Sequence, residues 1–130
     1  MRLKRFNQIN ESNGNFPFGY NKIKEIASTV NADIVYDNPS MMLIKINDYN
    51  ASKSLGSKHW GIVYQENMWN NYVHDFINCY FFYDFTKSEN DKEALIGAMV
   101  NPDGKITQCY FADDTVCPPE YLDIKLEGEE

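Results

Sequence analysis

The sequence has no long apolar run and few cysteines. No stretch approaches the about 20 consecutive apolar residues that a membrane-spanning helix needs, and residues 1–11 are basic but lack the apolar core of a signal peptide. The three cysteines are odd in number and widely spaced, whereas secreted disulfide frameworks use dense, even sets. We therefore expect a cytoplasmic protein with reduced thiols and no membrane partner.

The motifs of common enzyme chemistries are missing as well. The glycines form neither a P-loop nor a dinucleotide-binding fingerprint, and H-E-x-x-H, EF-hand, C-x-x-C and G-x-S-x-G patterns are absent. The only histidines are His59 and His74, and no motif joins them to Cys79 as a nucleophile and base. We predict no cofactor and no metal site, but leave open whether the adjacent Asp113 and Asp114 bind a cation.

Apolar and aromatic residues, by contrast, are plentiful. Of 130 residues, 43% are hydrophobic and 15% aromatic, which is enough to build one packed core. We expect a single domain over residues 1–130, with an N-terminal arm or short helix at 1–15 and a partly irregular tail at 118–130. Regular structure is expected to end at Cys117-Pro118-Pro119.

Periodicity predicts an α+β fold with an antiparallel sheet of five or six strands and two or three packed helices. Apolar residues recur at helical spacing in 20–30 and 66–76, and Asp48 is placed to cap a short helix that Gly56 ends. Turn residues at 38–40 and 101–104 indicate two hairpins. The expected strands are residues 33–37, 41–46, 60–64, 78–85, 94–100 and 106–111.

The run from Asn78 to Phe85 is the strongest predicted strand. Alternation places Phe81 and Tyr83 on one face and Phe82 on the other, so both faces are apolar. We therefore predict a central strand that is covered on both sides. Gly97, inside another predicted strand, indicates a bulge or a close backbone approach.

Charge is unevenly distributed along the chain. Residues 1–65 have a net charge of +3 and residues 66–130 a net charge of −10, for a total of −7. An acidic half repels nucleic-acid phosphates, which normally bind clustered Lys and Arg. It is suited to dock on a basic, nucleic-acid-binding groove of another protein, although a merely solvated acidic surface is the simpler interpretation.

Two segments resemble proteins of tailed bacteriophages. They are the opening MRLKRFNQINE and the block SLGSKHWGIVYQENMWNNY, where a Leu-Gly-Ser turn precedes Trp and a helix with Asn, an aromatic residue and Tyr follows. The phage proteins often carry Cys after this Trp, whereas this chain has Gly61. The resemblance implies a viral origin and covers about residues 54–112, but it carries over no function.

These observations favour a phage-encoded, non-enzymatic accessory protein that binds a host protein in the host cytoplasm. Its mode of action is predicted to be that of an anti-defence, anti-CRISPR-like inhibitor. Aromatic residues near Trp69 and Tyr72 are expected to supply an apolar anchor. The carboxylates expected to face Lys and Arg of the partner are Glu89, Asp91, Glu93, Asp103, Asp113 and Asp114.

Two alternatives stay open. The chain is also consistent with a virion or structural component whose acidic surface only keeps it dissolved. A small enzyme of unrecognised type would use His59 or His74 with nearby acids, and a cleft that contains a histidine and a converging carboxylate would favour it. The sequence does not determine the oligomeric state.

Overall fold

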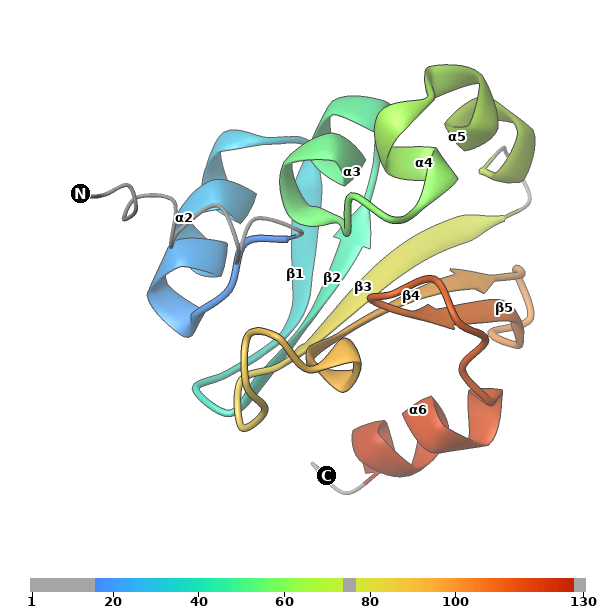
Figure 1. The fold of residues 1–130 in the computed structure, drawn as a ribbon. Helices are drawn as coiled ribbons and strands as arrows, with labels where there is room; N and C mark the ends of the chain where they lie inside the picture. The colour runs from blue at the N-terminus through green and yellow to red at the C-terminus, as the bar shows by residue number, and fades with distance from the viewer. Residues whose placement is uncertain (1–15, 74–76, 128–130) are drawn as a thin grey trace.

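A computed structural model describes residues 16–73 and 77–127 of the chain. Five strands form one antiparallel meander in the order β1-β2-β3-β4-β5 (Figure 1). The α+β class and the antiparallel sheet are therefore confirmed. The predicted N-terminal arm, His74 and Phe76 lie outside the described residues.

The sheet is built from two hairpins and a central strand. β1 (Ala32–Asn38) and β2 (Met41–Ile46) are joined by a turn in which the Asn38 side chain accepts a hydrogen bond from the Ser40 amide at 2.8 Å. β4 (Leu95–Val100) and β5 (Ile106–Phe111) are joined by a turn in which Gly104 has a φ of 87°. Both hairpins are confirmed, because asparagine and glycine supply the turn geometry that the sequence indicated.

β3 (Asn78–Asp84) is the middle strand, as predicted. Phe81 and Tyr83 pack into a core on one face of the sheet, and Phe82 packs into a second core on the other face. All three rings are at most 1% exposed. An unbroken apolar strand is stable here because each face has its own covering layer.

Four helices cover the first face over β1 to β3 (Figure 1). They are α2 (Tyr20–Thr29), α3 (Tyr49–Leu55), α4 (Gly61–Tyr64) and α5 (Glu66–Tyr72). α3 begins as predicted, because the Asp48 carboxylate accepts a hydrogen bond from the Ala51 amide at 2.9 Å.

The expectation of a strand at residues 60–64 is wrong. Trp60 precedes the single-turn helix α4, and both Ile62 and Val63 are buried within it. β-branched residues favour strands weakly, and burial against the neighbouring helices outweighs that preference here.

The second face is covered by α6 (Pro119–Glu127), whose Leu122 is 2% exposed. We expected regular structure to end at Pro118-Pro119, and this expectation is wrong. Proline is well tolerated at the first position of a helix, so Pro119 starts α6 rather than ending the fold. In the described ranges, no helix combines the length and apolarity needed to cross a membrane.

Candidate functional site

The Leu55-Gly56-Ser57 turn ties the helical layer to the sheet. The Leu55 carbonyl accepts a hydrogen bond from the Tyr83 hydroxyl, and the Ser57 hydroxyl donates to the Ala112 carbonyl just beyond β5. A Cβ on Gly56 would lie 2.5 Å from Val63 Cγ2 and 2.8 Å from the Ser52 carbonyl. The turn therefore needs glycine, and its serine serves the fold.

Trp60 completes this connection by lying on the backbone of β4. Its indole nitrogen donates to the Phe111 carbonyl at 2.9 Å, and the centroid of its ring lies 5.2 Å from the centroid of the Phe81 ring. Gly97 sits opposite Phe81 in the sheet register, and a Cβ there would lie 2.9–3.2 Å from the Trp60 ring. The predicted close approach at Gly97 is confirmed, and the approaching group is this indole.

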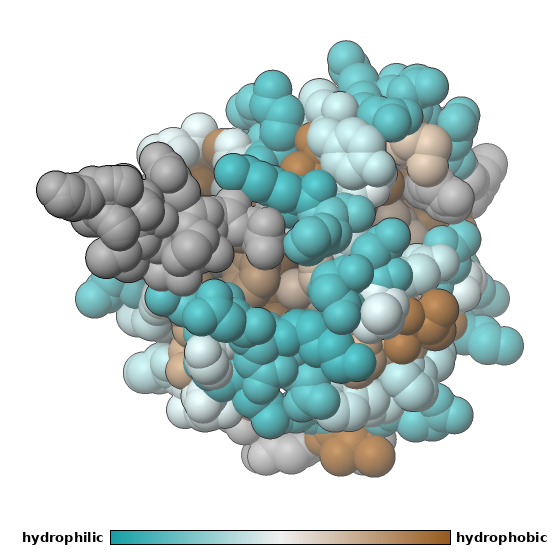
Figure 2. All heavy atoms as spheres, in the orientation of Figure 1, coloured by the Kyte–Doolittle hydropathy of each residue, from teal (hydrophilic) through white to brown (hydrophobic). Residues whose placement is uncertain are grey.

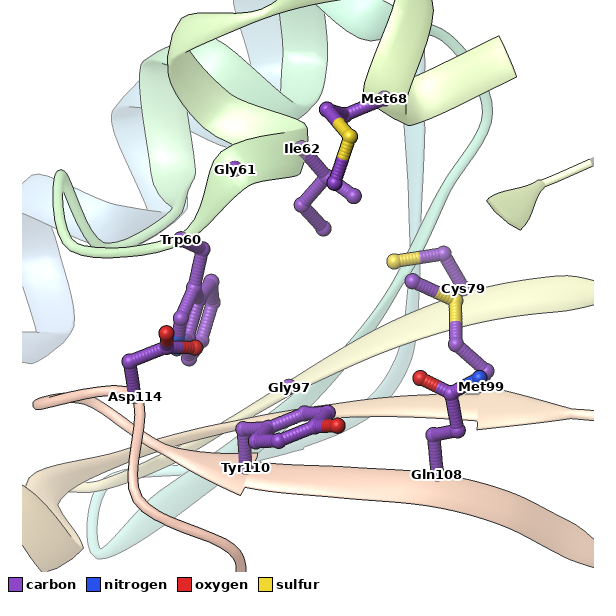
Figure 3. A pocket seen from close by; sticks show the side chains of 10 residues that line it. All are labelled: Trp60, Gly61, Ile62, Met68, Cys79, Gly97, Met99, Gln108, Tyr110 and Asp114. Atoms are coloured by element: carbon purple, nitrogen blue, oxygen red, sulfur yellow. The ribbon is translucent and has the colours of Figure 1, made fainter. Parts of the chain in front are cut away.

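The helices cover β1 to β3 and leave β5 uncovered on this face (Figure 1). A pocket lies beside Trp60. Its volume is about 180 Å³. Figure 3 shows side chains from α5, β5 and the turn after β5 surrounding it. We call it the Trp60 pocket, and its main lining residues are Trp60, Met68, Gly97, Gln108, Tyr110 and Asp114.

The floor of the Trp60 pocket follows from the strand register. Tyr110 pairs with Gly97 and Gln108 pairs with Met99, so both β5 side chains rise from the face that carries the helices. Tyr110 and Gly97 both line the pocket, and the Trp60 ring takes the place that a side chain on Gly97 would need. Cys79 lies deeper and fully buried, and burial raises the pKa of its thiol well above the usual range, so it stays protonated.

Five of the six predicted acidic residues gather at one end of the sheet. Glu89, Asp91 and Glu93 lie in the β3–β4 connection, while Asp113 and Asp114 lie in the turn after β5. A hydrogen bond of 3.0 Å from the Ala112 amide to the Lys92 carbonyl joins the two segments. We call these five residues the acidic end, and hydrophilic side chains cover the β3–β4 connection in Figure 2.

The other predicted binding residues are placed differently. Asp103 lies in the β4–β5 turn, at the opposite end of that hairpin from Asp113 and Asp114. Trp69 is 6% exposed and packs into the core, so the prediction that it anchors a partner at the surface is wrong. Its indole belongs to the core on the face that the four helices cover, so it contributes to stability. The side chain of Tyr72 lies outside what the structure describes.

Most carboxylates of the acidic end are already used by the fold. Asp91 accepts from the Glu93 amide at 2.9 Å, and Asp113 accepts from the amide and hydroxyl of Thr115. The Thr115 hydroxyl holds the pKa of Asp113 below its usual value. Hydrogen bonds from Tyr121 and Lys87 likewise lower the pKa of Glu93.

Asp114 differs from these neighbours. Its carboxylate has no side-chain partner within the described residues and faces the Trp60 pocket (Figure 3). Its backbone has a φ of 73°, a left-handed conformation that aspartate tolerates better than most residues. The two adjacent aspartates thus have different roles. Asp113 stabilises the turn through its hydrogen bonds with Thr115, whereas the Asp114 carboxylate can accept hydrogen bonds from a ligand.

A second hollow of about 140 Å³ contains His59 together with Asp91, Lys92 and Asp113. This is the kind of cleft that the enzyme hypothesis required. Both carboxylates are held by their own turns, however, and the His59 side chain makes no hydrogen bond or ion pair with any described residue. Its described lining contains no Ser, Thr or Cys to act as a nucleophile.

A metal site has no support in the described part of the chain. No group of three or more His, Cys, Asp or Glu residues there is arranged to hold an ion. Asp113 and Asp114 are adjacent in sequence, but Asp113 is directed at Thr115 and Asp114 at the Trp60 pocket. Divalent cations need several converging oxygens, and this pair does not converge with further ligands.

Comparison with models of protein families, with curated proteins and with solved structures found no match. The resemblance to tailed-phage proteins therefore stays a prediction. Within the block that carries it, Leu55, Gly56, Ser57 and Trp60 have the structural roles described above, and position 61 lines the Trp60 pocket.

The sequence reasoning missed Gln108 and Tyr110. One signal for them was available, because alternation in Ile106–Phe111 places both residues on the face opposite the buried Cys109 and Phe111. That they border a pocket depends on Trp60 and Gly97, which are far from them in sequence.

Proposed function

We propose that this protein binds a basic host protein through its acidic end and thereby inhibits it. The observation that carries the proposal is the convergence of Glu89, Asp91, Glu93, Asp113 and Asp114 on one end of the sheet. Lys87 and Lys92 are the only cations in these two segments, so the acidic end keeps a net negative charge.

A partner with a nucleic-acid-binding groove fits this charge. Such a groove is lined by Lys and Arg that neutralise phosphates, and a surface of carboxylates competes for the same cations. Charge complementarity of this kind speeds association and makes binding sensitive to salt. In this proposal the acidic end occupies the groove and excludes the nucleic acid, as an anti-defence inhibitor of phage origin would.

The structure allows the charge to be removed without removing the turns. Asn keeps the Oδ1 acceptor that Asp91 and Asp113 use, so the variant Glu89→Gln/Asp91→Asn/Asp113→Asn loses three charges and retains both caps. The matched control removes three exposed carboxylates elsewhere, in Glu25→Gln/Glu66→Gln/Asp103→Asn. Both variants have the same net charge and leave Asp114 intact.

The test uses the heparin-binding fraction of a host-cell lysate, which is enriched in proteins with basic grooves. We expect the wild-type protein and the control variant to retain a stoichiometric partner at low salt and to block that partner's binding to nucleic acid. The acidic-end variant should retain far less. Equal retention by all three proteins, or a captured partner that still binds nucleic acid, would contradict the proposal.

A further inference from the structure

The Trp60 pocket has one formal charge, and that charge is negative. Asp114 contributes a carboxylate, and among the described residues neither Lys nor Arg lines the pocket. The Gln108 carboxamide and the Tyr110 hydroxyl also border it, and both have no side-chain partner in the described chain. All three groups can accept hydrogen bonds, so the pocket suits a ligand that is positively charged and rich in donors.

The aromatic walls favour the same ligand. Tyr110 and Trp60 border the space above Gly97, with the Met68 thioether across from them (Figure 3). A cation over the face of Tyr or Trp is attracted by the ring quadrupole. Guanidinium is planar, stacks on aromatic rings and can donate two parallel hydrogen bonds to one carboxylate, whereas an ammonium group acts as a point charge.

The size of the pocket limits the ligand to a small group. Pockets for drug-sized molecules usually enclose about 300–1,000 Å³, and this one encloses about 180 Å³. That space suits the head group of one side chain. Asp114 is exposed, lines the pocket and also belongs to the acidic end, so the pocket adjoins the surface on which the partner is proposed to lie.

We propose that the Trp60 pocket binds the guanidinium group of an arginine side chain on the basic partner. The carboxylate of Asp114 takes the paired hydrogen bonds, the Tyr110 ring lies against the guanidinium plane, and Gln108 accepts a further N–H. This inference rests on the proposed function for the source of the arginine. The chemistry of the pocket itself can be tested without a partner.

The first test is an NMR titration of the isotope-labelled full chain with arginine amide. We expect saturable shifts centred on the amides of Gly61 and Gly97 and on the Trp60 indole N–H. Lysine amide should bind more weakly. Citrulline amide, in which a neutral urea group of similar shape replaces the charged guanidinium, should cause no focused shift. Equal effects of citrulline amide, or shifts spread evenly over the surface, would overturn the proposal.

The matched variants are Asp114→Asn and Asp103→Asn. Both remove one exposed carboxylate, but only the first faces the pocket. Asp114→Asn should weaken arginine amide binding by about tenfold or more, because it removes a charge-assisted pair of hydrogen bonds, and Asp103→Asn should leave it unchanged. An unchanged affinity in Asp114→Asn would count against the pocket.

The two proposals fail in different ways. If arginine amide binds but the acidic-end variant loses no partner, the pocket stands and the proposed function falls. If the partner is lost on neutralising the acidic end but is retained by Asp114→Asn, which also leaves arginine amide binding intact, the function stands and the pocket falls.

Discussion

Two hollows in the described part of the chain are each bordered by at least one aspartate, but they differ in whether the fold already uses the polar groups around them. In the hollow beside His59, Asp91 and Asp113 are both hydrogen-bonded within their own turns. In the Trp60 pocket, Gln108, Tyr110 and Asp114 have no side-chain partner in the described residues. A carboxylate in a cleft therefore indicates a ligand site only where the fold does not already use it for its own hydrogen bonds.

A similar contrast exists within the Trp60 pocket. Its inner wall, formed by Trp60 and Gly97, is fixed by hydrogen bonding and close packing. The polar side chains of its rim have no side-chain partner in the part of the chain that the structure describes. Changes in the wall should therefore reduce stability, and changes at the rim should reduce binding alone.

The largest effect is expected for Trp60→Ala. The substitution removes a buried indole and its hydrogen bond to the Phe111 carbonyl, which keeps the Asp114 amide as a donor. The free energy of unfolding should fall by about 3–5 kcal/mol, mainly because a large buried side chain is lost. Urea unfolding followed by far-UV circular dichroism measures the change. The control is Tyr64→Ala in α4, the helix that follows Trp60, because Tyr64 is 59% exposed. A similar loss in both variants would show that Trp60 does not anchor this wall.

Gly56→Ala comes next. The added methyl group would meet Val63 and the Ser52 carbonyl, and overpacking of this kind costs about 1–3 kcal/mol. Gly61→Ala is the control, because its nearest neighbour is the flexible end of Met68 at 3.2 Å and alanine suits a helix. Thermal unfolding should separate the two variants, and a stable Gly56→Ala protein would refute the crowding argument.

The buried Asp84 should make stability depend on pH. Burial alone would raise its pKa, but hydrogen bonds from Lys125 at 2.7 Å and from Thr86 lower it below the usual value. A lowered pKa stabilises the fold above the unfolded-state value of about 3.9, and this contribution is lost as the pH falls through the folded-state value. Unfolding free energies measured from pH 7 to pH 2 should fall less steeply in Asp84→Asn. Parallel curves for the two proteins would contradict this assignment.

The smallest effects distinguish the two adjacent aspartates. Asp113→Ala removes the acceptor for Thr115 and should lower the free energy of unfolding by about 1 kcal/mol. Asp114→Asn should change it by less than about 0.5 kcal/mol, because no side-chain contact with a described residue is lost and asparagine tolerates the left-handed backbone. Chemical denaturation of both variants measures these changes. A larger loss of unfolding free energy at position 114 than at position 113 would contradict the assignment of the two roles.

The sheet was predictable from the sequence because its signals are local. Turn residues at Asn38-Pro39-Ser40 and Asn101-Pro102-Asp103-Gly104 set both hairpins, and the doubly apolar run at Phe81 to Tyr83 marked the central strand. The α3 cap at Asp48 is equally local.

The sequence-based predictions were wrong where packing between residues far apart in the chain determines the local structure. Ile62 and Val63 have β propensity, yet they are buried in α4. Pro118-Pro119 predicts an end of regular structure, although Pro119 begins α6. The candidate site shows the same limit. Six carboxylates were predicted from the sequence, and five of them lie at the acidic end. The different roles of Asp113 and Asp114 depend on a turn geometry that composition does not reveal.

The central claim is that Asp114 is held ready for a ligand while its neighbour Asp113 serves the fold. The most direct measurement is to determine arginine amide affinity and unfolding free energy together for Asp114→Asn and Asp113→Asn. We expect Asp114→Asn to lose affinity at unchanged stability and Asp113→Asn to keep its affinity. Retained affinity in Asp114→Asn, or a loss of stability in that variant, would contradict the claim.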